Sequence, residues 1–179
     1  NLITPRAGGT AVDLDLHIGR VQALFPALAG AASIKAKASK LAGGWDISVD
    51  GSGTAGFTLL AEGVVQEDLQ TANLSLSGAV PLEALNTVTS PASLRGRANF
   101  DLMIDGPLKL PSVSGTVQTS DARLALPQLK LALSGINAKI ALQNANASID
   151  LNSDVVAGGR VAVNGTVGLQ APFHAGLDI

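Results

Sequence analysis

The sequence contains no cysteine and no tyrosine, and its aromatic residues are one tryptophan and four phenylalanines. Without cysteine, disulfides and cysteine-based metal sites are excluded, whereas the compartment stays open because many periplasmic and cytosolic proteins alike lack cysteine. Cores between β-layers usually rely on aromatic rings, each of which buries a large area. Here the apolar residues are Ala, Val, Leu and Ile, together with 20 glycines. Such residues coat the face of a sheet more easily than they fill a thick core.

Charge of either sign is also sparse. The net charge is −2, and only 15% of the residues are charged. A nucleic-acid-binding protein normally carries a basic stripe with interleaved aromatic residues, and this chain has none. The residues that come nearest to forming a basic cluster are Lys35, Lys37 and Lys40. We interpret them as the solvated face of a strand.

The residues that catalysis or metal binding would need are few. His17 and His174 are the only histidines, and with no cysteine they are too few for an ordinary metal site. No nucleophile elbow and no phosphate-binding loop occurs. Paired aspartates with the spacing of a strand face, as in glycosidases, also arise on any half-solvated strand; the pairs are Asp13/Asp15, Asp46/Asp50 and Asp101/Asp105. We therefore expect no enzyme, no cofactor and no metal site.

Long apolar runs are absent as well. The best candidate for a membrane span, residues 21–32, is interrupted by Pro26 and is shorter than the roughly 18 residues that a spanning helix needs. The chain starts without an initiator methionine or a targeting segment, and its last residues, 173–179, still have the pattern of a strand. We therefore expect residues 1–179 to form one β-domain that is a fragment of a longer protein.

What the sequence has in abundance is alternation of apolar and polar residues. This period of two marks strands with one apolar and one polar face. The alternating segments are residues 12–18, 34–38, 45–49, 57–61, 74–80, 94–104, 113–117, 129–133, 136–142, 149–151, 161–169 and 173–179. Charged residues occupy one side of nearly all of them, so a slip of one residue would bury charge and the register is well specified.

A polar residue followed by glycine recurs along the chain, at Asp50-Gly51, Glu62-Gly63, Ser77-Gly78, Asp105-Gly106, Ser114-Gly115, Ser134-Gly135 and Asn164-Gly165. Such pairs favour tight turns, and we expect some of them to be turns. Gly115 and Gly165, however, lie inside alternating segments, on the apolar side. A glycine there usually marks a bend or a bulge, and several of them would let one long sheet curl.

Two segments break the alternation. Apolar residues at helical spacing predict a short helix within residues 20–30, kinked or ended near Pro26. Residues 81–86 predict one helical turn that begins with Pro81. No linker rich in Pro, Gly or Ser separates a second domain.

The apolar side of the strands has two interpretations: the core of an ordinary β-sandwich, or an exposed or semi-open apolar groove. The low aromatic content and the many glycines favour the groove. Its expected lining is Leu14, Leu16, Ile47, Val49, Phe57, Leu74, Leu76, Phe100, Leu102, Ile104, Val117, Leu131, Ile140, Leu142, Ile149, Leu151, Val161, Val163, Val167 and Leu169.

The order and spacing of several short motifs carry a family resemblance. In the second half these are Phe100-Asp101-Leu102, Gly106-Pro107-Leu108, Ser114-Gly115-Thr116-Val117, Ala122-Arg123-Leu124, Pro127, Ala157-Gly158-Gly159-Arg160-Val161, Asn164-Gly165-Thr166-Val167 and Pro172-Phe173. The first half contributes Asp15-Leu16-His17, Trp45-Asp46 and Val80-Pro81-Leu82. With these motifs the chain resembles the C-terminal domain of the TamB family, within the AsmA-like group of envelope proteins.

The resemblance implies an all-β fold: a long curved sheet shaped like a taco shell, whose U-shaped interior is apolar and holds acyl chains. It also implies a parent protein with an inner-membrane anchor that bridges the periplasm and meets the outer-membrane barrel protein TamA. Members of the family are implicated in phospholipid transport between membranes and, as part of the translocation and assembly module, in outer-membrane biogenesis and protein secretion. The family has no catalytic residues, so none is carried over.

Two functional hypotheses follow. The first is a non-enzymatic lipid conduit. The second is a scaffold that helps nascent outer-membrane β-strands, including those of autotransporters, to assemble by strand addition at open sheet edges. A third hypothesis, a secreted β-solenoid adhesin, would require regular short repeats, which the sequence lacks.

Overall fold

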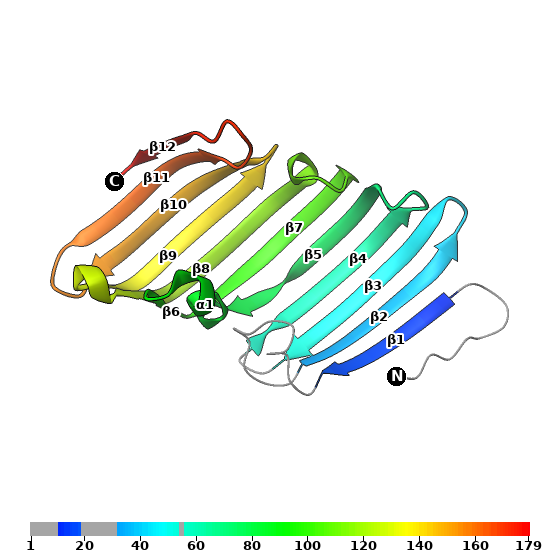
Figure 1. The fold of residues 1–179 in the computed structure, drawn as a ribbon, viewed down its shortest axis with the longest axis horizontal. Coiled ribbons are helices and arrows are strands. Elements are labelled where there is room, and N and C mark those ends of the chain that lie inside the picture. The colour runs from blue at the N-terminus through cyan, green and yellow to red at the C-terminus, as the bar shows by residue number, and fades with distance from the viewer. Residues whose placement is uncertain (1–10, 19–31, 54–55) are drawn as a thin grey trace.

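Twelve strands of one sheet make up most of the computed structural model, which describes residues 11–18, 32–53 and 56–179 (Figure 1). The strands are β1 (Ala11–Ile18), β2 (Ala32–Leu41), β3 (Gly44–Gly53), β4 (Thr58–Gln66), β5 (Thr71–Pro81), β6 (Ser93–Arg95), β7 (Arg97–Pro107), β8 (Val113–Leu126), β9 (Leu131–Gln143), β10 (Asn146–Val155), β11 (Arg160–Gly168) and β12 (Ala175–Asp178). Neighbours in the chain are neighbours in the sheet, and all pairs are antiparallel. The exception is β6, which pairs with β8.

Helical structure in the described part of the chain is confined to segments of three or four residues, two of which follow each other directly. The turn predicted at residues 81–86 is confirmed: Pro81 immediately precedes the 3₁₀ turn η3 (Leu82–Leu85), which continues into α1 (Asn86–Thr89). Two further 3₁₀ turns, η4 (Leu110–Ser112) and η5 (Pro127–Leu129), lie in the connections between β7 and β8 and between β8 and β9. The helix predicted within residues 20–30 lies outside the described residues.

No helix among the described residues has both the length and the apolar character needed to cross a membrane.

The two faces of the sheet differ in chemistry, as the alternation predicted. On the polar face, charges of opposite sign oppose each other across strands, as at Lys35–Asp50 and Lys139–Asp150. Such cross-strand pairs stabilise a sheet modestly. The register therefore places nearly all charged strand residues on this one side.

Lys40 is the exception: it is exposed, as expected for a solvated strand residue, but it lies on the other side of the sheet from Lys35 and Lys37. The register places Lys40 opposite Trp45, on the apolar side near the end of β2. Its ammonium group lies 4.9 Å from the centre of the Trp45 ring and forms an ion pair with Glu67. The methylene stem of Lys40 thus lies on apolar surface, while its charged group lies at the end of the strand.

None of the seven polar-glycine pairs forms a turn, contrary to the expectation for some of them. All seven glycines lie within strands. Gly115 shows why: its φ is +128°, and a Cβ there would overlap the carbonyl oxygen of Asp101 and lie 2.7 Å from the Cα of Leu102. Glycine at this position permits a bend with very close approach of two strands, which is how curvature enters a long sheet.

Two bulges keep apolar side chains on one face where the alternation skips a residue. In β9, Gly135 adopts a φ of +56°, and the pairing with β10 shifts between Asn152 and Asp154. Leu133 and Ile136, three positions apart, consequently face the same side. The predicted segments 129–133 and 136–142 are therefore joined within one strand, with Leu129 itself in the preceding turn η5. A second bulge at Asp121, with φ +52°, shifts β8 against β9 in the same way.

The sheet has no closed core in the part that the structure describes. Among the described residues no large side chain is fully buried, and the buried apolar residues are mostly small ones, namely Val65, Ala72, Ala79, Ala98, Ala122, Ile136, Ala145 and Ala147. The described strands belong to a single layer rather than to a sandwich. The predicted all-β fold with an open, uncovered sheet is thus confirmed, and the sandwich-core interpretation is wrong for these residues.

Candidate binding site: the apolar face of the sheet

Two uninterrupted rows of apolar residues and glycines cross the sheet from edge to edge. Following the backbone register, the first row is Leu16, Ile34, Gly51, Leu59, Gly78, Phe100, Val117, Ile140, Ile149, Gly165 and Leu177. The second row is Leu14, Ala36, Val49, Ala61, Leu76, Leu102, Gly115, Leu142, Ala147, Val167 and Ala175. We call the side of the sheet that carries these rows the apolar face.

Most of the predicted lining residues lie in or beside these rows. A third, shorter row holds Ile47, Leu74 and Ile104. The remaining strand residues also face this side: Leu151 opposite Val163, Val161 opposite Ser153, and Leu131 opposite Leu126. Phe57 precedes β4, and Leu169 follows β11. For Leu14 and Leu16 only the backbone register lies within the described structure.

Several residues of the apolar face were not predicted as lining. Leu124 and Leu133 oppose each other, and Val155 lies opposite Leu133 on the next strand. All three lie beyond the bulges, where the alternation changes phase. Leu124 and Leu126 do alternate with Arg123 and Ala125, so this signal was present in the sequence.

The apolar face is unusually open for so much hydrophobic surface. The described lining side chains are only partly buried. Because exposed contiguous apolar surface larger than a few hundred Å² usually marks an interaction site, this face is the candidate site of the protein.

The dimensions of the face restrict what it can hold. The sheet path contains eleven strands side by side, so each full row is about 48 Å long at the usual strand spacing of about 4.8 Å. An acyl chain reaches across half of a hydrocarbon core that is about 30 Å thick. The rows are therefore long enough for acyl chains placed end to end.

Polar atoms are rare on this face. Besides Lys40 and Trp45, which lie at strand ends, the register assigns Thr119 and Ser153 to it. The Ser153 hydroxyl is the buried side-chain polar atom without a hydrogen-bond partner among the described residues. With so few directional groups, the face can bind guests through contact area but cannot fix the orientation of a polar substrate.

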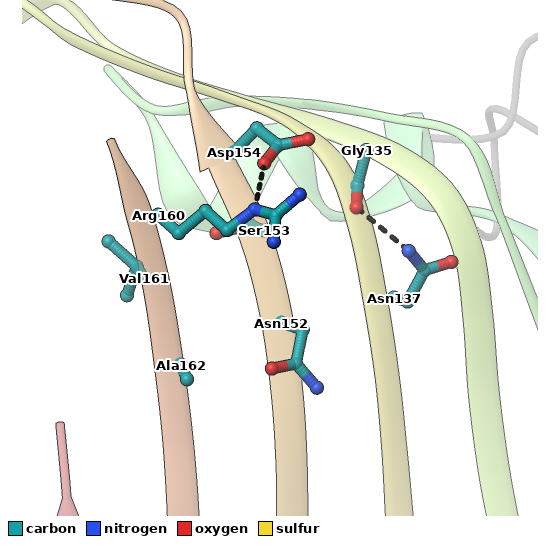
Figure 2. Close-up of a pocket in the computed structure, with 8 residues that line it drawn as sticks. All are labelled: Gly135, Asn137, Asn152, Ser153, Asp154, Arg160, Val161 and Ala162. Carbon is teal, nitrogen blue, oxygen red and sulfur yellow. Dashed lines mark hydrogen bonds and ion pairs between the residues drawn. The ribbon is translucent and has the colours of Figure 1, made fainter. Parts of the chain in front are cut away.

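The polar face carries a shallow hollow of about 340 Å³ over β9, β10 and β11 (Figure 2). The bulge at Gly135 contributes to it, and the Asn137 amide donates a hydrogen bond to the Gly135 carbonyl at 2.9 Å. Arg160 pairs with Asp154 at 3.1 Å, so the charges at this hollow neutralise each other (Figure 2). No group of three or more metal-ligating side chains occurs in the described ranges.

Comparison of the chain with protein-family models, curated proteins and solved structures finds no match. The case for a function therefore depends on the geometry of the two faces and on the resemblance in the sequence.

The exposed edge of the sheet at β12 predicts self-association. All four β12 residues are exposed, and the unpaired side of an edge strand templates pairing with another chain. We expect the chain to associate at micromolar concentrations without detergent, and Leu177→Lys to reduce this association at least several-fold in sedimentation velocity.

Phe173→Lys is the matched control for this prediction. Phe173 is 75% exposed but precedes the strand, so this variant gains the same charge and loses comparable apolar surface without altering the edge. An equal effect of both variants would show that general stickiness, rather than edge pairing, causes association. A wild-type chain that stays monomeric would contradict the prediction outright.

Proposed function

We propose that this chain forms a section of a non-enzymatic conduit for phospholipid acyl chains across a cell envelope. The observation that supports the proposal best is the pair of unbroken apolar rows, which run across every strand of the sheet path. A guest that moves along a row meets the same chemistry at each strand, so no site along the way holds it tightly. The absence of directional polar groups suits a cargo recognised by its hydrocarbon alone.

The resemblance to the TamB family supports the proposal independently. On that basis the cargo passes through the periplasm, and the chain belongs to an inner-membrane-anchored envelope protein whose outer-membrane partner is TamA. Lipid delivered in this way would contribute to outer-membrane biogenesis. The few aromatic residues fit such a role, because large rings would fill the space that acyl chains need.

A direct test is native mass spectrometry of the chain purified from membranes, with extraction and identification of what co-purifies. Phospholipid bound in discrete stoichiometries is the expected result. A chain that carries no lipid and takes up none from vesicles would contradict the proposal.

The free edge at β12 favours a second candidate, the scaffold that adds nascent outer-membrane strands. Here affinity would come from main-chain hydrogen bonds at the edge rather than from the apolar rows. Binding of a barrel-derived strand peptide to a lipid-free chain, weakened by Leu177→Pro, would favour this candidate over the conduit.

A further inference from the structure

Two arginines face each other on the polar side of the sheet. Arg95 of β6 and Arg123 of β8 are direct cross-strand partners, and both side chains are exposed. Directly opposed side chains have Cβ atoms about 4.5–5.5 Å apart, and like charges in this arrangement destabilise a sheet. Within the described residues, the ion pairs are Lys40–Glu67 and Arg160–Asp154. Neither arginine therefore forms an ion pair with a described acidic side chain, although the Glu83 carboxylate lies close by, where it accepts a hydrogen bond from the N–H of Gly96 at 3.1 Å.

The arginine pair lies at a hollow rather than on a flat sheet. Both arginines, with Ser93 and Ser134, line a space of about 320 Å³ whose remaining lining is apolar. One wall is Val156, held over the end of β9 because its backbone N–H donates to the Ala132 carbonyl at 2.9 Å. None of the described residues that line this space is acidic. We call it the arginine hollow.

The positive charge of the arginine hollow and its hydrogen-bond donors call for a ligand that is negatively charged and rich in acceptor oxygens. Two guanidinium groups supply two positive charges and two planar forks of N–H donors, which match the oxygens of a phosphate group. Ser93 and Ser134 also line the hollow, and a serine hydroxyl can donate a further hydrogen bond to such a ligand. A carboxylate neutralises one charge only, whereas a phosphomonoester brings close to two negative charges and three terminal oxygens.

From the opposed arginines and the concave hollow around them, whose described lining contains no acid, we infer that this site binds a phosphomonoester. Binding replaces repulsion between Arg95 and Arg123 with attraction of both to one anion. The volume exceeds that of phosphate alone, and the apolar walls accommodate a small organic remainder. The arginine hollow lies on the polar face, so the inference does not depend on lipid transport along the apolar face.

The test uses glycerol 3-phosphate as the probe and measures its affinity for the full chain by calorimetry, at constant ionic strength set with chloride. Wild type should bind, and Arg123→Gln should bind at least about 10-fold more weakly, since charge-assisted hydrogen bonds are lost. Without ligand, Arg123→Gln should be no less stable than wild type, because the like-charge pair is removed. Arg160→Gln is the matched control: it removes an arginine from the same face, outside the hollow, and should bind like wild type.

Vesicles distinguish a soluble ligand from a lipid headgroup. Phosphatidylcholine vesicles containing phosphatidic acid present a phosphomonoester, and vesicles with equal phosphatidylglycerol present a phosphodiester. Binding to phosphatidic acid that Arg123→Gln weakens supports the site with a lipid source, and binding to glycerol 3-phosphate alone supports it with a soluble source. Equal loss in Arg123→Gln and Arg160→Gln, or no binding to either probe, would overturn the inference.

Discussion

Replacing Leu102 by arginine is expected to abolish phospholipid binding while leaving the chain folded. Leu102 is partly buried in the second row, between Leu76 and Gly115. On an open face an arginine keeps its stem on the apolar wall and its charged head in water, so the free energy of unfolding should fall by only about 1–2 kcal/mol, as for an average substitution. The charge nevertheless interrupts the apolar path, because apposition to acyl chains would desolvate it. Val163→Arg, opposite Leu151, should behave alike.

Neighbouring residues supply matched controls for these two variants. Met103 is 50% exposed and Ala162 is exposed, and both face the polar side. Met103→Arg and Ala162→Arg should bind lipid like wild type. The measurements are urea unfolding and transfer of a fluorescent phospholipid from vesicles. Unfolded Leu102→Arg and Val163→Arg variants would contradict an open face at these positions, and folded variants with full transfer would contradict lipid passage along the rows.

Replacing Gly115 by alanine is expected to lower the free energy of unfolding by about 3 kcal/mol or more, although it adds only one methyl group. Part of this loss comes from its φ of +128°, since a conformation reserved for glycine costs about 1–3 kcal/mol for another residue. The rest comes from steric overlap, because the added Cβ would clash with backbone atoms of β7, which cannot rotate away as a flexible side chain can. To relieve this overlap, β7 and β8 must separate, and the sheet would flatten locally.

Gly158 separates these two causes. Its φ is +109°, similar to that of Gly115, yet a Cβ there has no atom within 4 Å. Gly158→Ala should therefore show only the conformational cost, about 1–2 kcal/mol, in the same unfolding experiment. Equal losses in the two variants would mean that close approach of the strands contributes nothing. A stable Gly115→Ala chain with unchanged lipid binding would argue that curvature at this point is dispensable.

The alternation in the sequence was sufficient to predict an all-β fold and to assign nearly every strand residue to a face. It succeeded because burying a charge is costly, so residues such as Asp101 and Lys139 can occupy only the solvated side. Lys40 is a charged strand residue on the apolar side, where its position near the end of β2 lets its ammonium group reach Glu67. The alternation of apolar and polar residues indicates which face a residue occupies, but not how close that residue lies to the end of its strand.

For the polar-glycine pairs, the local sequence was a poor guide to the structure. Asp50-Gly51 and Asp105-Gly106 have the composition of tight turns, but they lie in strands β3 and β7. The β4–β5 hairpin instead turns at Leu69, whose φ of +53° is uncommon for a bulky residue. A dipeptide preference of this kind is weak, and the pairing of long strands overrides it.

The order of residues along the chain therefore decided the secondary structure, the polarity of each face and the lack of material for a thick core. Only the tertiary structure decided that the apolar positions align into rows across the whole sheet, because alignment depends on register between strands and on the bulges at Asp121 and Gly135. It also decided that Arg95 lies opposite Arg123. These neighbours are 28 residues apart in the sequence (123 − 95), and no periodic pattern within one strand specifies which residue of another strand it will meet.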